Sequence, residues 1–67
     1  MRAEPKARLT ELLREAQRQR DAMREFGLAG YATMVEKHRE RLDAVLGKIR
    51  EHCREHGLPL PEGVPAE

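Results

Sequence analysis

The sequence has few of the residues that usually stabilise small proteins. Its 67 residues include one cysteine, one tyrosine, one phenylalanine and no tryptophan. A single cysteine excludes an intrachain disulfide framework, and an aromatic content of 3% is unlike that of a β-sandwich or barrel. A domain of this size seldom stabilises itself through one core. The composition therefore predicts an all-helical protein that gains stability by oligomerisation.

Long apolar runs and an excess of one charge are also absent. No apolar run approaches the roughly 20 residues of a membrane span, and residues 1–5 lack the apolar core of a secretory signal. We therefore expect a cytoplasmic protein without membrane contact. The 13 Lys and Arg residues nearly balance the 12 Asp and Glu residues. Net charge alone thus does not predict a nucleic-acid partner.

Two proline-free segments carry apolar residues at alternating spacings of three and four. This spacing indicates helices that turn one face toward a partner helix. We expect the first helix at about residues 4–26 and the second at about 31–56. The predicted stripes are Leu9, Leu12, Ala16, Gln19, Met23 and Phe26, and then Tyr31, Val35, His38, Leu42, Val45, Ile49, His52 and His56.

Proline and glycine predict where these helices begin and end. Pro5 suits the first turn of a helix, where its missing N–H costs no hydrogen bond. Gly27 and Gly57, each followed by leucine, predict left-handed helix stops. The expected organisation is a helical hairpin over residues 1–57, with a turn at about 27–30, and an extended proline-rich tail over 58–67.

The start of the second helix has two interpretations. Gly30 can precede its first turn, or Thr33 and Glu36 can form a capping box that moves the start to residue 34. We favour the earlier start because Tyr31 fits the apolar stripe. The tail also has two interpretations, since its leucines and prolines suit either a polyproline ligand or packing over the end of the bundle, which we favour.

The short turn predicts an antiparallel hairpin. Folding the chain there places Phe26 beside Tyr31 and puts the two polar residues of the stripes, Gln19 and His38, in one layer. Such a layer can fix helix register. Because each stripe is wider than one partner helix can cover, we predict that two hairpins form a homodimeric four-helix bundle.

His52 and His56 are candidate metal ligands because their spacing of four residues puts both imidazoles on one side of a helix. The adjacent Cys53 is a third candidate, although it points about 100° away from His52. A metal site would need ligands from a second copy. Residues at a polar helix edge are the simpler interpretation, so we expect no metal and no cofactor. His38 has no nucleophile or paired acid on its face, and we expect no enzymatic activity.

Lys6, Arg20 and Arg24 share one flank of the first helix and are the candidate RNA contacts. Ten of the 13 basic residues are Arg, which suits phosphate recognition. The flank has no aromatic residue for base stacking, and acids recur three residues from bases, as in Glu15 and Arg18. A solvated, salt-bridged surface is therefore the favoured interpretation, with nucleic acid as the less favoured partner.

Two architectural resemblances bear on function. The stretch 39–43, Arg-Glu-Arg-Leu-Asp, resembles the Ser-Gln-Glu-Leu-Asp signature of small sporulation aspartyl-phosphate phosphatases only in its Leu-Asp pair, so the resemblance does not imply that activity. In length, hairpin plan and tail, the chain resembles dimeric RNA-binding bundles of the plasmid copy-number (Rop) type, with no shared residue motif. We predict a small bacterial, non-enzymatic protein-interaction or regulatory module. The alternatives are an RNA-binding bundle and a metal-responsive one.

Overall fold

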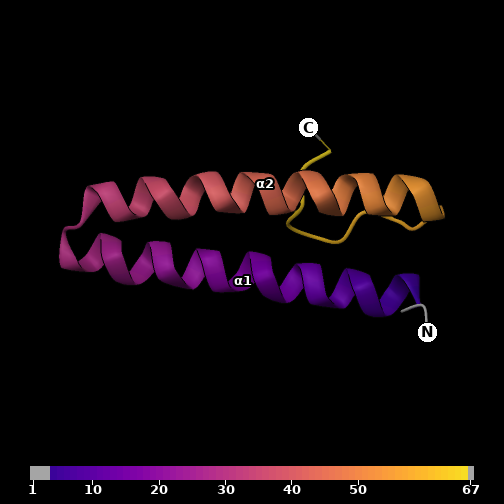
Figure 1. The fold of residues 1–67 in the computed structure, drawn as a ribbon, viewed down its shortest axis with the longest axis horizontal. Coiled ribbons are helices and arrows are strands. Elements are labelled where there is room, and N and C mark those ends of the chain that lie inside the picture. Colours follow the sequence, from indigo (N-terminus) through magenta and orange to yellow (C-terminus); the bar gives the residue numbers. More distant parts are fainter. Residues whose placement is uncertain (1–3, 67) are drawn as a thin grey trace.

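The protein is a hairpin of two antiparallel helices, α1 (Pro5–Ala29) and α2 (Ala32–His56). A computed structural model describes residues 4–66, and no strand occurs within that range. The helices lie side by side along their whole length, and the tail returns along them (Figure 1). The all-α hairpin predicted from the sequence is confirmed. Within the described range, neither helix has an apolar stretch that could cross a membrane.

The helix stop predicted at Gly27 is wrong. Helix α1 continues through Ala29 and ends at Gly30, whose φ of 81° is left-handed. The N–H of Gly30 donates to the Gly27 carbonyl at 3.2 Å, and the N–H of Tyr31 donates to the Phe26 carbonyl at 2.9 Å. These two hydrogen bonds form a Schellman motif. The turn predicted at about 27–30 is therefore reduced to two residues, the left-handed Gly30 and Tyr31, which is the N-cap of α2.

An apolar contact explains why the chain turns at Gly30 and not at Gly27. In a Schellman motif the residue after the left-handed glycine packs back onto the last turn of the helix. Tyr31 does so, since its ring meets that of Phe26 edge to face with centroids 6.1 Å apart. Leu28, the corresponding residue after Gly27, is 83% exposed. The aromatic pair is thus available to only one of the two glycines.

We expect Gly27→Ala to raise and Gly30→Ala to lower the free energy of unfolding. A Cβ at Gly27 would meet Val35 Cγ2 at 3.9 Å, an ordinary contact, and alanine stabilises a helix by up to about 1 kcal/mol over glycine. At Gly30 the positive φ costs an L-residue about 1–2 kcal/mol. Thermal unfolding followed by circular dichroism measures both changes, and shifts of the same sign would contradict the assigned helix end.

Helix α2 follows the predicted boundaries closely. It begins at Ala32 without a side-chain cap, which confirms the earlier of the two starts and excludes a Thr33 capping box. It ends at His56, and Gly57 follows with a φ of 63°. The N–H of Leu58 donates to the Cys53 carbonyl at 2.9 Å. The stop predicted at Gly57 is confirmed.

The core occupies only the half of the hairpin away from the turn. All of the buried side chains in the described range come from the first half of α1, the second half of α2 and the tail. They are Leu12, Ala16, Val45, Leu46, Ile49, Cys53 and Val64. In the half near the turn, Met23, Phe26, Met34 and Val35 are half-buried. The two helices and the tail together therefore close the half away from the turn more completely than the half near it.

The tail folds back along the hairpin without forming a helix or strand. Leu58 packs against the core cluster, and Val64 joins it with 8% of its surface exposed. Between them the Val64 N–H donates to the Pro61 carbonyl at 3.2 Å, and Gly63 has a φ of 85°. This geometry is a glycine-bearing β-turn. The turn points the Val64 side chain into the hairpin.

Candidate functional site

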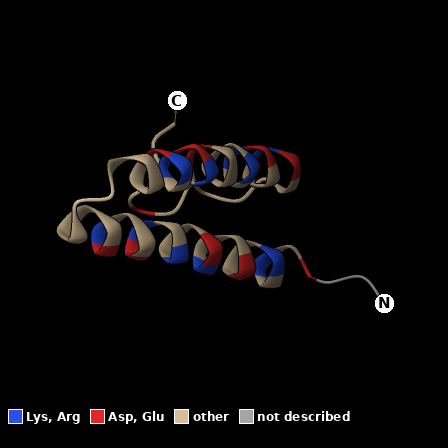
Figure 2. Ribbon diagram, turned by 60° about the vertical axis from the view of Figure 1, so that its left-hand side comes forward, with Lys and Arg blue, Asp and Glu red and all other residues tan. Residues whose placement is uncertain are grey.

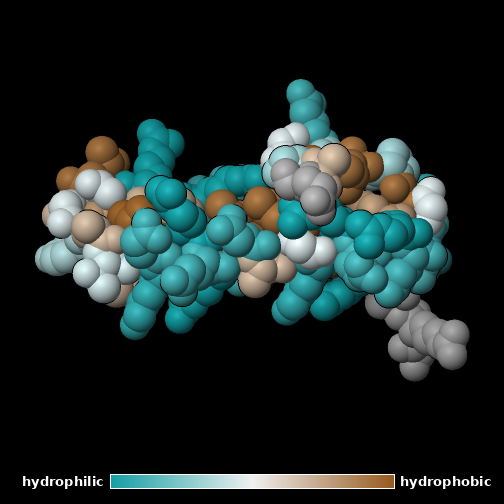
Figure 3. Space-filling view, turned by 90° about the horizontal axis from the view of Figure 1, so that it is seen from above, coloured by the Kyte–Doolittle hydropathy of each residue, from teal (hydrophilic) through white to brown (hydrophobic). Residues whose placement is uncertain are grey.

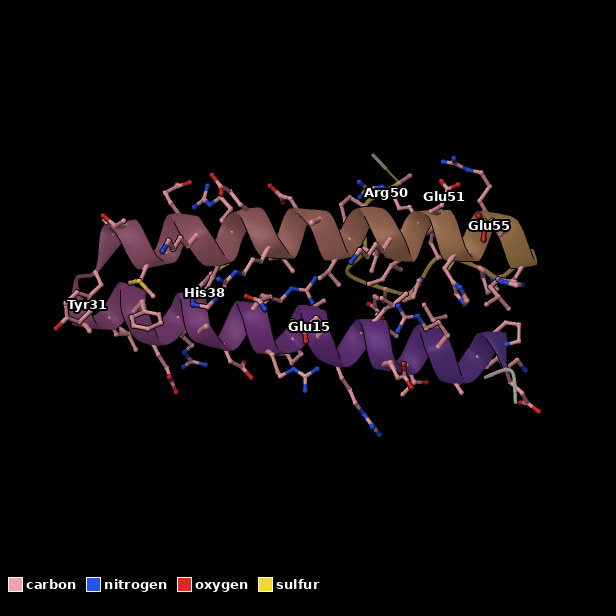
Figure 4. The ribbon with its side chains drawn as sticks, in the orientation of Figure 1. Glu15, Tyr31, His38, Arg50, Glu51 and Glu55 are labelled. Atoms are coloured by element: carbon pink, nitrogen blue, oxygen red, sulfur yellow. The ribbon has the colours of Figure 1, made fainter. Side chains whose placement is uncertain are left out.

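The polar layer predicted at Gln19 and His38 is confirmed. His38 Nδ1 lies 2.7 Å from Gln19 Oε1, and Gln19 Nε2 donates to Glu15 Oε1 at 2.8 Å. The amide nitrogen of Gln19 donates to Glu15, so the amide oxygen of Gln19 is the atom that faces His38. Because that oxygen can only accept, Nδ1 of His38 carries the hydrogen. Phe26 stacks on the imidazole with ring centroids 5.5 Å apart. Figure 4 shows His38 between α1 and α2.

Glu15 extends this layer to the surface. Arg18 donates to Glu15 Oε2 from Nε at 3.0 Å and from Nη2 at 2.6 Å. The hydrogen bond from Gln19, followed by that from Arg18, lowers the pKa of the Glu15 carboxyl. The result is a continuous chain of hydrogen bonds from Arg18 to His38.

Replacing Gln19 with leucine is expected to raise the pKa of Glu15 toward its ordinary value. The substitution removes the largest cause of the lowered pKa. A lowered folded-state pKa stabilises the fold above the unfolded-state pKa, and this contribution is lost as the pH falls through the folded-state value. A carboxyl-detected NMR titration measures the change, with Arg18→Ala as the comparison. An unchanged Glu15 pKa in the Gln19→Leu protein would contradict the assigned network.

The structure brings together two of the three candidate metal ligands. The His52 and His56 rings are 4.6 Å apart. His52 Nε2, however, donates to the Pro5 carbonyl of α1 at 2.7 Å, and the buried Cys53 thiol donates to the Pro59 carbonyl at 3.8 Å. No group of three or more His, Cys, Asp or Glu side chains in residues 4–66 is placed to hold a metal ion. His52 thus joins the two helices.

The three candidate RNA contacts have different surroundings. Lys6 and Arg24 are exposed, whereas Arg20 is half-buried and donates through Nη2 to the Gly63 carbonyl at 3.3 Å. From α2, Arg50 Nη1 donates to the Pro65 carbonyl at 3.3 Å, and Figure 4 shows Arg50 beside the end of the tail. Arg20, one of the three candidate RNA contacts, therefore holds the tail.

The opposite side of the helix seam is charged. A groove of about 420 Å³ runs there over the buried Leu12 and Val45. Ion pairs line it, Arg8 to Glu11 at 3.1 Å and Arg18 to Glu15 at 2.6 Å. The remaining lining residues of this charged groove are Arg14 and Lys48. Figure 2 shows charged residues along both helices and none at the turn.

An apolar surface lies at the turn. No charged residue occurs over 26–35, and within that stretch Leu28 is 83% and Tyr31 60% exposed. An apolar hollow opens beside them, lined by Gly27, Gly30, Ala32, Val35 and the neighbouring Glu36. We call these residues together the turn-end surface. In Figure 3 hydrophobic residues gather at this end and again around the tail.

The side chains of the predicted association stripes are buried between the two helices to different degrees. Leu12, Ala16, Val45 and Ile49 are buried, and Tyr31 is exposed. The other members are half-buried, namely Leu9, Gln19, Met23, Phe26, Val35, His38 and Leu42.

Sequence reasoning missed the turn-end surface because it looked for periodic apolar positions. The uncharged stretch 26–35, in a chain with 37% charged residues, was the available signal.

Comparison of the chain with protein-family models, with curated protein sequences and with solved structures finds no match.

Proposed function

We propose that this protein is a small non-enzymatic interaction module that acts through helical self-association, with the turn-end surface as the interface between two copies. The observation that carries the proposal is the uneven burial of the stripes. Among residues 4–66, buried side chains occur only in the half away from the turn, while Leu28 and Tyr31 are largely exposed. Contiguous exposed apolar surface on a small protein is typical of an interaction site.

The shape of the turn-end surface favours a second copy as the partner. It combines a projecting side chain, Leu28, with a hollow lined by Gly27, Ala32 and Val35. A twofold interface places the same surface of both subunits in contact. Leu28 of each copy can then fill the hollow of the other, and the two hairpins form a homodimer joined at their turn ends. The charged groove on the other side of the seam is less suited to such an interface.

Replacing Ala32 with glutamate is expected to weaken self-association by about tenfold or more, because a charge in the hollow must be desolvated when a second copy docks. Ala32 lines the hollow and is exposed. The variant therefore leaves the hairpin intact, and an acid in the first turn of α2 stabilises that helix. Sedimentation equilibrium over a range of concentrations measures the dissociation constant.

Thr33→Glu is the matched control. It adds the same charge in the same helical turn at an exposed position outside the hollow, so its self-association should resemble that of the unaltered chain. Equal weakening by the two substitutions would indicate a general charge effect. A chain that remains monomeric at millimolar concentration would contradict the proposal.

A further inference from the structure

We propose that the hairpin face under the tail is a peptide-binding site, occupied in cis by residues 58–66. Its ligand in trans is a short acidic segment of another protein with a proline-flanked, glycine-bearing turn and an aliphatic residue. This inference is independent of the proposed self-association, because the residues that hold the tail are not those of the turn-end surface.

The face recognises its ligand through the peptide backbone. Arg20 of α1 and Arg50 of α2 donate to the carbonyls of Gly63 and Pro65, each at 3.3 Å. The two guanidinium groups therefore bind the segment from both helices, on either side of Val64. Contacts to carbonyls do not depend on the side chains of the ligand. A different segment with the same backbone path can make the same two hydrogen bonds.

Selectivity comes from one aliphatic side chain and the turn before it. Val64 is 8% exposed within the core cluster, and the turn from Pro61 to Val64, with Gly63 at a φ of 85°, directs it inward. A positive φ at this turn position favours glycine. Proline restricts the unbound segment, which reduces the entropy lost on docking.

Charge complementarity favours an acidic ligand. The tail contains Glu62 and Glu67 and no basic residue. The face that it covers presents Arg20 and Arg50, and Arg24 is exposed one helical turn from Arg20. Opposite charges on a site and its ligand increase both the association rate and specificity.

The docked tail is a displaceable occupant. It contributes no helix or strand, and both arginine bonds to it are exposed. Segments with few buried contacts open more readily than the core. Because the tail is tethered, it competes at a high effective concentration, of the order of millimolar. A ligand in trans must therefore bind far more weakly to the full chain than to a chain whose own tail is undocked.

The single cysteine reports whether the site is occupied. Cys53 is 2% exposed, and its thiol lies 3.8 Å from the Pro59 carbonyl of the tail. In the full-length Val64→Asp protein, the buried aspartate should release the tail and increase the rate of thiol modification by about tenfold or more. Leu60→Asp is the matched control, since it adds the same charge to the tail at a residue that is 41% exposed.

The decisive experiment adds a synthetic peptide with the sequence of residues 58–67 to the Val64→Asp protein. We expect saturable protection of the Cys53 thiol, and binding about tenfold or more weaker to the unaltered chain, where the tethered tail competes. The same peptide carrying Val64→Asp should not protect. If the Val64→Asp chain loses its helical circular dichroism signal, the Gly63→Val chain is used in its place, because a β-branched residue at a φ of 85° strains the docked tail and leaves Arg20 and Arg50 unaltered.

Three results would overturn the peptide site. The first is a Cys53 thiol that reacts no faster after the tail substitution. The second is an exposed thiol that the peptide fails to protect at millimolar concentration. The third is a Val64→Asp chain that becomes dimeric with its thiol still protected, because a second copy would then cover the face. None of these three results involves the Ala32→Glu variant, so a failure of the peptide site can be distinguished from a failure of the proposed self-association.

Discussion

Replacing Ile49 with alanine is expected to lower the free energy of unfolding by about 3–4 kcal/mol, the typical cost of truncating a fully buried aliphatic side chain. Ile49 has no exposed surface and is the largest fully buried side chain of the described range. It lies in the core cluster with Leu12 and Val64, so its truncation leaves a cavity among side chains of both helices and the tail.

This loss is large for a chain of 67 residues, whose total stability is expected to be about 3–10 kcal/mol. Urea denaturation followed by circular dichroism measures the change, with Ile49→Val as the graded control at about 1 kcal/mol. A loss below about 1 kcal/mol for the alanine variant would show that residue 49 is not at the centre of the core.

Leu12→Ala is expected to cost about 3 kcal/mol and Met23→Ala only about 1 kcal/mol, because the lost stability scales with the apolar surface that was buried. Both residues belong to the α1 stripe. Leu12 is 6% exposed, whereas Met23, nearer the turn, is half-buried. The pair tests whether stability is concentrated in the half of the hairpin away from the turn.

The comparison requires a protein concentration at which the chain is monomeric, because a second copy covering the turn end would increase the cost at Met23. Native-state hydrogen exchange gives an independent measurement. Amides near the turn should exchange through openings of lower free energy than those around Val45 and Ile49. Equal losses of unfolding free energy for Leu12→Ala and Met23→Ala would contradict an unevenly closed seam.

The sequence was sufficient to predict the hairpin, because helical periodicity and glycine position are local signals. The pairing of Gln19 with His38 followed from counting residues on either side of the turn, and the structure places them 2.7 Å apart. The pairing is correct although α1 ends at Ala29, three residues beyond the predicted end. The predicted neighbours Phe26 and Tyr31 are in contact, but choosing Gly30 over Gly27 also required knowing that the Tyr31 N–H bonds to the Phe26 carbonyl and so closes the Schellman motif.

The candidate site was less accessible to sequence reasoning. The docked tail depends on contacts over long sequence separations, 43 residues between Arg20 and Gly63, and no local pattern encodes such a pair. Val64 was the available sign, as an aliphatic residue in a segment of prolines and acids. The two arginines that hold the tail could not be singled out in this way, because Arg20 and Arg50 are two of ten arginines in the chain.

The two-residue connection of Gly30 and Tyr31 has a consequence for the order of folding. Contacts across a very short turn close small loops, so two helices joined in this way should form early and fast. The tail closes a long loop, from Arg20 to Gly63, and its residues follow the hairpin in the chain, so they are synthesised after it. During synthesis the hairpin can therefore be complete while the face beneath the tail is still open, and this interval gives a competing segment its first access to that face.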